Sequence, residues 1–150
     1  MQQQRRDFLA LVSLMAAAGL LPAGAVRAED WNKAAFAAKS MGELLGILGA
    51  GTPQLSAEVV LVAPEIAENG AVVPVEIESK LPATQSIAIL IEKNPNILTA
   101  SFDIPSGTLP WLQTRVKMAE TCNVYVLVAA GGRYYYATKE IKVTLGGCGG

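Results

Sequence analysis

Apolar residues alternate with polar ones over short segments from residue 57 onward, and this period of two most constrains the fold. Val73, Val75 and Ile77 are separated by proline or glutamate, and Ile141 and Val143 flank a lysine. Such alternation is typical of strands that turn one face toward a core. Turn residues separate the segments, which predicts seven or eight strands in the ranges 57–62, 71–78, 86–92, 97–104, 112–118, 123–129, 133–137 and 140–145.

The segment before the strands has a longer period. Apolar residues from Trp31 to Leu48 recur at intervals of three and four, which predicts one N-terminal helix. Many short strands with a single helix are typical of an all-β sandwich. Asn69-Gly70 is typical of a hairpin turn whose central residues both have positive φ, and Pro74 is expected at a sheet edge or bulge.

Residues 1–28 have the features of an export signal that is removed. Arg5-Arg6 precedes an apolar run at residues 8–21, which is too short to span a membrane. The arginine pair followed by Phe8-Leu9 favours the twin-arginine route over the general secretory route. Either route predicts a protein of the bacterial periplasm with one domain at 29–150. Two small-residue segments are candidate cleavage sites, at residues 26–28 and 23–25.

Charge and residue types exclude several classes of function. The chain has no histidine, and its formal net charge is −1 without a basic block, which argues against nucleic-acid binding. Two cysteines without histidine argue against a zinc or copper site. Neither a Ser-His-Asp nor a Cys-His catalytic unit can be assembled. We therefore expect no metal, no other cofactor and no catalytic residue in this chain.

The sequence LGGCGG places one thiol among glycines at residues 146–150. Cys148 follows Gly146 and Gly147 and precedes Gly149 and Gly150. Glycine leaves the backbone free and adds no width, so a thin, flexible arm is expected that holds the thiol roughly 10 Å from the domain. No cation on the arm would lower the thiol pKa. Cys148 is therefore expected to be an attachment point for a covalent cargo that other enzymes activate.

Cys122 has a different setting, at the start of an apolar strand. It is expected to be a small buried side chain on one face with Val124, Val126 and Val128. The alternative is a redox role, either as a resting disulfide with Cys148 or as the resolving partner in a thiol–disulfide protein. Two further alternatives are a ubiquitin-like carrier that activates the carboxylate of Gly150, and a passive interaction module.

Two groups of surface residues have two interpretations each. Tyr134, Tyr135 and Tyr136 indicate either alternating core and surface packing along a strand or a face that contacts a partner. Lys139 and Lys142 are expected to be solvated charges, with guidance of an anionic cargo as the alternative.

The chain resembles the SoxY family, the sulfur-carrier subunits of the bacterial Sox thiosulfate-oxidising system. The resemblance covers Met41 to Gly150, and the twin-arginine signal agrees with it. It rests on four segments, APEIAENGAVVPVEIES (63–79), IAILIEKNPNILTASFDI (87–104), TRVKMAETCNVYVLV (114–128) and KEIKVTLGGCGG (139–150). Two positions depart from the family pattern, because Cys122 replaces an expected small hydroxyl residue and the second proline expected after Asn96 is missing.

The resemblance implies an immunoglobulin-like β-sandwich that forms a heterodimer with a second sandwich subunit, SoxZ. It implies that Cys148 carries thiosulfate-derived sulfur, with the flanking glycines as the swinging arm. A c-type cytochrome would attach thiosulfate to the thiol, a hydrolase would release sulfate, and a sulfane dehydrogenase, where present, would oxidise the remaining sulfur. The chain itself would be a carrier and not an enzyme.

Overall fold

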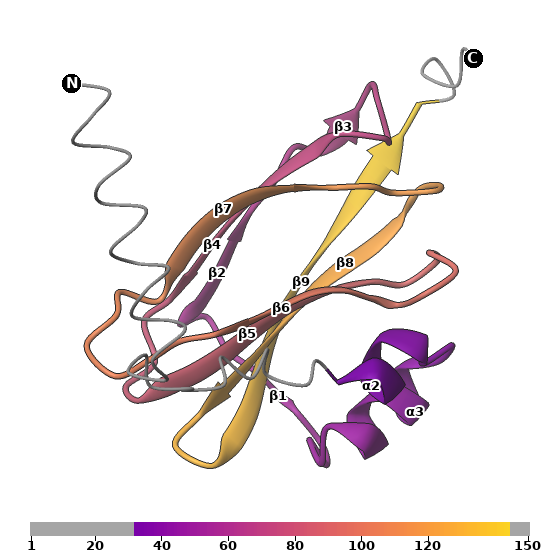
Figure 1. Cartoon of the computed structure of the whole chain (residues 1–150). Helices are drawn as coiled ribbons and strands as arrows, with labels where there is room; N and C mark the ends of the chain where they lie inside the picture. The colour runs from indigo at the N-terminus through magenta and orange to yellow at the C-terminus, as the bar shows by residue number, and fades with distance from the viewer. Residues whose placement is uncertain (1–31, 145–150) are drawn as a thin grey trace, which may run out of the picture. The chain divides into compact units, whose positions relative to one another are not determined.

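The computed structural model describes residues 32–144 (Figure 1). The chain divides into two units, Met1–Trp31 and Asn32–Gly150, and only residues of the second unit are described. The predicted export signal at 1–28 and the predicted arm at 146–150 lie outside the described residues. No helix within residues 32–144 is long and apolar enough to cross a membrane.

The described strands form two sheets that face each other. The larger sheet has six strands in the order β1-β9-β8-β5-β6, with β3 also paired to β9, and the smaller has the order β2-β4-β7. The predicted all-β class and immunoglobulin-like sandwich are confirmed. The strands are β1 Gln54–Leu55, β2 Val59–Val62, β3 Ile66–Ala67, β4 Val73–Ser79, β5 Thr84–Ile91, β6 Leu98–Asp103, β7 Trp111–Val116, β8 Cys122–Ala130 and β9 Arg133–Val143.

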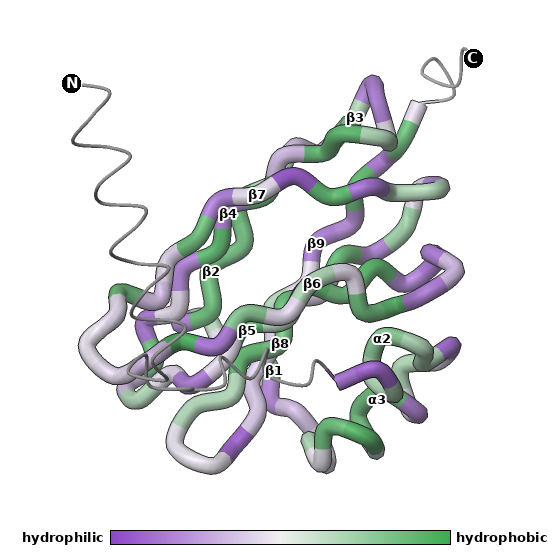
Figure 2. The backbone as a smooth tube through the Cα atoms, in the orientation of Figure 1, coloured by the Kyte–Doolittle hydropathy of each residue, from purple (hydrophilic) through white to green (hydrophobic). Residues whose placement is uncertain are grey.

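The alternation in the sequence decides which face of each strand is buried. In β4, Val73, Val75 and Ile77 are buried, while Pro74 between them is exposed. These side chains pack between the two sheets against Ile89 of β5 and its neighbours. Burial of each such side chain contributes about 1.5–3 kcal/mol. Figure 2 shows hydrophobic residues along β2 and through α3. The buried apolar side chains form two clusters, one between the two sheets and one between the helices and the larger sheet.

Two short helices cover the outer face of the larger sheet, where one helix was predicted. They are α2 Lys33–Ala37 and α3 Met41–Ile47, and the buried Leu44 of α3 packs toward Leu90 and Leu127 of the sheet. The break follows from helix capping. Ser40 has an extended backbone, and its side chain accepts a hydrogen bond from the amide of Glu43 at 3.2 Å. Ser40-Met41-Gly42-Glu43 is a capping-box sequence, so the start of α3 was visible in the sequence.

The last strand is one element rather than the predicted pair at 133–137 and 140–145. β9 pairs with β8 without interruption, including Thr138 opposite Tyr125 and Lys139 opposite Val124. The polar run after Ala137 resembles a turn locally, but ladder hydrogen bonds to β8 keep these residues extended. β9 ends at Val143, and Leu145, the predicted last residue of the strand, lies outside the described residues.

The prediction of a tight hairpin turn at Asn69-Gly70 is wrong. Neither residue has a positive φ, and the connection from β2 to β4 is long enough to contain β3. The two predicted strands do pair, because β2 and β4 are antiparallel neighbours. The prediction for Pro74 is confirmed, because Pro74 lies beyond the last residue that β2 pairs, so β4 has one open side there.

The tyrosine run packs on both faces of β9. Tyr135 contacts the core between the sheets, whereas Tyr134 and Tyr136 contact the core beneath the helices. The hydroxyl of Tyr134 donates to the carbonyl of Leu48 at 3.0 Å and so attaches the end of α3 to the sheet. The expected alternation between core and surface is therefore not seen, because both faces of the run pack against a buried cluster and all three tyrosines are partly buried.

Candidate functional site at the end of strand β9

The end of β9 is the described segment that is nearest in sequence to the predicted attachment point. The described residues stop at Thr144, four positions before Cys148. Cys148 and its flanking glycines, Gly146, Gly147, Gly149 and Gly150, lie outside them. We call the residues around the end of β9 the arm root, and it consists of segments 65–70, 118–121 and 142–144.

One side of the arm root is held by β3. This short strand runs parallel to β9, with Ile66 opposite Lys142 and Ala67 opposite Val143 (Figure 1). The amide of Lys142 donates to the carbonyl of Glu65 at 2.9 Å, and the amide of Thr144 donates to the carbonyl of Ala67 at 3.1 Å. The two-residue strand β3 and the residue before it therefore hold the chain up to Thr144, its last described position.

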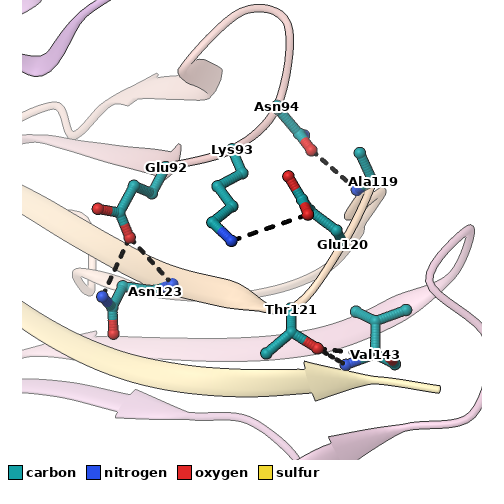
Figure 3. A network of polar contacts seen from close by, with 8 residues as sticks. All are labelled: Glu92, Lys93, Asn94, Ala119, Glu120, Thr121, Asn123 and Val143. Atoms are coloured by element: carbon teal, nitrogen blue, oxygen red, sulfur yellow. Dashed lines mark hydrogen bonds and ion pairs between the residues drawn. The ribbon is translucent and has the colours of Figure 1, made fainter.

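The other side of the arm root is held by a side chain. The β8–β9 ladder ends where Cys122 pairs with Ile141, because the chain bends immediately before β8. Beyond that pair, the side chain of Thr121 provides the hydrogen-bond partner. Its hydroxyl accepts a hydrogen bond from the amide of Val143 at 2.9 Å and donates to the carbonyl of the same residue at 3.4 Å (Figure 3).

Gly70 completes the packing of the arm root. Its carbonyl accepts a hydrogen bond from the amide of Met118 at 2.7 Å. A β-carbon on Gly70 would lie 2.6 Å from the carbonyl oxygen of Met118 and 2.8 Å from Cγ1 of Val143. Position 70 therefore needs glycine because of this close approach, and not because of positive φ.

The turn between β5 and β6 supports the arm root from outside. The side chain of Asn94 donates to the carbonyl of Lys117 at 2.7 Å and accepts from the amide of Ala119 at 3.0 Å. Lys93 and Glu120 form an ion pair at 3.7 Å, with side chains 50% and 61% exposed, so solvent reduces its contribution. Figure 3 shows the hydrogen bond between Asn94 and Ala119 and the ion pair between Lys93 and Glu120. The sequence did not predict these contacts, because they join two segments that are more than 20 residues apart.

Cys122 is buried in the core between the sheets, as predicted. It is 4% exposed and lies in the same core as Val124, Val126 and Val128. Burial raises the pKa of the Cys122 thiol above its ordinary value, which disfavours the reactive thiolate. Within residues 32–144, Cys122 forms no disulfide. An inaccessible thiol with a raised pKa is poorly suited to be the resolving partner in a thiol–disulfide protein.

Lys139 and Lys142, which the sequence predicts to be solvated charges or guides for an anionic cargo, have different environments. Lys139 donates through Nζ to the carbonyl of Ala63, so it ties β9 to the connection after β2. Lys142 is exposed at the arm root, next to the described end of the chain. Within residues 32–144, no group of three or more His, Cys, Asp or Glu side chains is arranged to hold a metal ion.

A cavity of about 450 Å³ lies between α3 and the outer face of the larger sheet. Its lining is mainly apolar and includes Leu45, Leu90 and Tyr125, with Lys39 and Glu92 as its charged members. The sequence did not predict this cavity, since the lining residues come from a helix and three different strands.

The comparisons with known proteins agree on one family. The family model described as "Sulfur oxidation protein SoxY" matches residues 46–148. The solved sulfur carrier protein SoxY from Chlorobium limicola f thiosulfatophilum is 38% identical, with 75% of this chain and 99% of that chain covered and a TM-score of 0.64. A superoxide reductase (neelaredoxin) from Ignicoccus hospitalis is 16% identical, with 57% and 80% covered and a TM-score of 0.52, and shares the fold alone. A search of curated proteins found no match.

Proposed function

We propose that this chain, which belongs to the SoxY family of sulfur oxidation proteins, carries thiosulfate-derived sulfur as a covalent adduct on Cys148. Membership of the family gives it a role as a carrier in sulfur oxidation. The observation that carries the proposal is the 38% identity to a sulfur carrier over 99% of that protein's length. The match to the family model extends to residue 148, so it includes the cysteine.

The environment of the second cysteine supports the choice of Cys148. A carrier thiol has to enter the active sites of other enzymes, and Cys122 is buried between two sheets. Cys148 follows the described end of β9 by four residues, so it can lie at most about 14 Å from Thr144. The short strand β3 and the hydroxyl of Thr121 hold the base of this segment, which gives the proposed arm a fixed origin.

The proposed chemistry takes place on the thiol but is catalysed by partners. Joining thiosulfate to the Cys148 thiol forms a sulfur–sulfur bond and releases the thiol proton and two electrons. The two electrons would pass to the haems of a c-type cytochrome. Hydrolysis by a second enzyme then releases sulfate and leaves a persulfide on Cys148. A sulfane dehydrogenase, where present, would oxidise that remaining sulfur. The chain supplies a tether and an attachment atom, and it is a carrier rather than an enzyme.

The proposal includes a location and a partner subunit. The twin-arginine signal at residues 1–28 would export the folded protein to the periplasm, where the other Sox enzymes act on it. A SoxZ-like sandwich subunit would form a heterodimer with this chain. Export of a folded pair accounts for a twin-arginine signal on a chain for which no cofactor is expected.

Mass spectrometry of the full chain tests the proposal. The protein is incubated with thiosulfate and the oxidising cytochrome, and the intact mass and the mass of the C-terminal peptide are measured. We expect one thiosulfate-derived adduct on Cys148, its loss in Cys148→Ser, and its retention in Cys122→Ser. An adduct that survives Cys148→Ser, whether on Cys122 or on the carboxylate of Gly150, would contradict the proposal.

A further inference from the structure

We propose that Thr121 is a positioning residue for the carrier arm, because its hydroxyl fixes the residue at which the chain leaves the sheet. The importance of this residue for sulfur transfer rests on the proposed carrier function. The contacts that support the inference all lie within the described residues, and they concern the last residues of β9.

The first step is the direction of the backbone groups along β9. The carbonyl of Tyr136 accepts from the amide of Ser56, and the amide of Lys142 donates to the carbonyl of Glu65. Both residues therefore turn their backbone groups away from β8. Because these groups alternate along a strand, Val143 must turn its amide and carbonyl toward β8.

The second step is that β8 offers no backbone partner at this position. The register would place Glu120 opposite Val143, but the ladder stops at the pair Cys122 and Ile141. The hydroxyl of Thr121 fills this place, since it receives the amide of Val143 at 2.9 Å and reaches its carbonyl at 3.4 Å. A hydroxyl suits this role because it is both a donor and an acceptor.

The third step is that Thr121 is itself held in place. Asn94 bonds to the backbone of Lys117 and of Ala119, within the segment that leads to Thr121. Figure 3 shows the bond to Ala119. Met118 is bonded in turn to Gly70, which packs on the side chain of Val143. The hydroxyl of Thr121 is thus presented from a segment with three backbone anchors.

The consequence concerns the length of the tether. Without the hydroxyl, Val143 has no partner toward β8, and the end of β9 is held only by the bonds of Lys142 and Thr144 to Glu65 and Ala67. Whenever these remaining bonds open, the free segment begins about two residues earlier, which adds up to roughly 7 Å of reach. A longer and looser tether lowers the effective concentration of the thiol at a site whose distance matches the original length. Thr121 would therefore set the efficiency with which partner enzymes use the arm.

The test compares Thr121→Val, which removes the hydroxyl at nearly constant shape, with Thr121→Ser, which keeps it. In Thr121→Val we expect amide hydrogen exchange at Val143 to become about tenfold faster, as for the loss of one net hydrogen bond. We expect kcat/KM for thiosulfate loading by the cytochrome to fall about two- to fivefold through a higher KM. Thr121→Ser should restore both values.

Thr138→Val is the matched control. The hydroxyl of Thr138 also belongs to the β8–β9 pair and donates to the carbonyl of Val124 at 3.1 Å, but it lies away from the arm root. This variant should leave exchange at Val143 and loading unchanged. An equal effect of both variants would reduce the role of Thr121 to general stability and overturn the proposal.

The two readouts separate this inference from the proposed function. Wild-type exchange at Val143 in a folded Thr121→Val protein would overturn the inference, as would faster exchange with unchanged loading. If Thr121→Val does not fold, Asn94→Ala takes its place and is expected to speed exchange at Val143, and an unchanged rate overturns the inference. Absence of any adduct on Cys148 in the wild type would refute the proposed function. The exchange measurement would still test whether the Thr121 hydroxyl holds Val143.

Discussion

Gly70 lies against Val143 so closely that a β-carbon at position 70 would stand 2.8 Å from Cγ1 of Val143. The two residues are far apart in sequence, and they meet because β3 draws segment 65–70 alongside the end of β9. The contact makes the last residue of β9 part of the core packing. It is the structural reason why the proposed arm has a rigid base.

Gly70→Ala tests this packing. The new methyl group would collide with the carbonyl of Met118 as well as with Val143, so we expect the free energy of unfolding to fall by about 1–3 kcal/mol. Gly42→Ala in α3 is the control, since a β-carbon there meets no atom within 4 Å. It should raise stability by about 0.5–1 kcal/mol. Chemical denaturation measures both, and equal effects of the two variants would contradict the close contact.

Tyr134→Phe tests the attachment of the helices to the sheet. The variant loses the hydrogen bond from the Tyr134 hydroxyl to the carbonyl of Leu48, and we expect a loss of about 0.5–1.5 kcal/mol. Amide exchange in α3 should become faster while exchange in β8 stays the same. Tyr135→Phe, whose ring packs in the core between the sheets, should leave α3 unchanged. Unaltered exchange in α3 of the Tyr134 variant would show that the bond does not hold the helix.

The buried thiol predicts a dependence of stability on pH. Burial raises the pKa of Cys122, so the folded protein holds the thiol proton more tightly than the unfolded chain does. Its contribution to stability is full below the ordinary thiol pKa and is lost as pH rises through the raised value. The stability difference between wild type and Cys122→Ala should stay constant to about pH 8 and shrink above about pH 9. A difference that grows with pH would show the opposite sign of shift.

Gly147→Val tests whether the proposed arm has to be thin. Valine adds width next to the thiol and restricts the backbone, so loading of Cys148 by the cytochrome should fall at least about tenfold. Alkylation of Cys148 by a small reagent should change little, because that reaction needs no narrow channel. Undiminished loading of the valine variant would argue against entry of the arm into partner active sites.

Arg5→Lys with Arg6→Lys tests the export route. We expect the double variant to remain in the cytoplasm with residues 1–28 attached, as measured by cell fractionation and N-terminal sequencing. A variant with Arg27→Lys, outside the arginine pair, should still be exported. Normal export of the double variant would favour the general secretory route.

Most of the strands were predictable because local alternation indicates them, but their number was not, since the structure describes nine strands where seven or eight were predicted. The same alternation predicted that Cys122 is buried, and the side chain lies where expected. Two other local patterns led to wrong element boundaries. The capping box at Ser40 divides the predicted helix, and the polar residues after Ala137 do not interrupt β9.

The arm root could not be predicted in the same way. β1 and β3 have two residues each, which is too short for a period, and both exist only because β9 lies beside them. The side chain of Thr121 replaces backbone partners, and nothing in its neighbouring residues indicates this. The requirement for glycine at Gly70 depends on two distant residues, Met118 and Val143.

The sequence by itself determined the sandwich class, the burial of Cys122 and the family to which the glycine-flanked Cys148 points, because periodicity and motif are properties of neighbouring residues. Only the tertiary structure decided where β9 ends and what holds that end. Those features depend on contacts between segments that are distant along the chain, and such contacts are fixed only when the two sheets pack together.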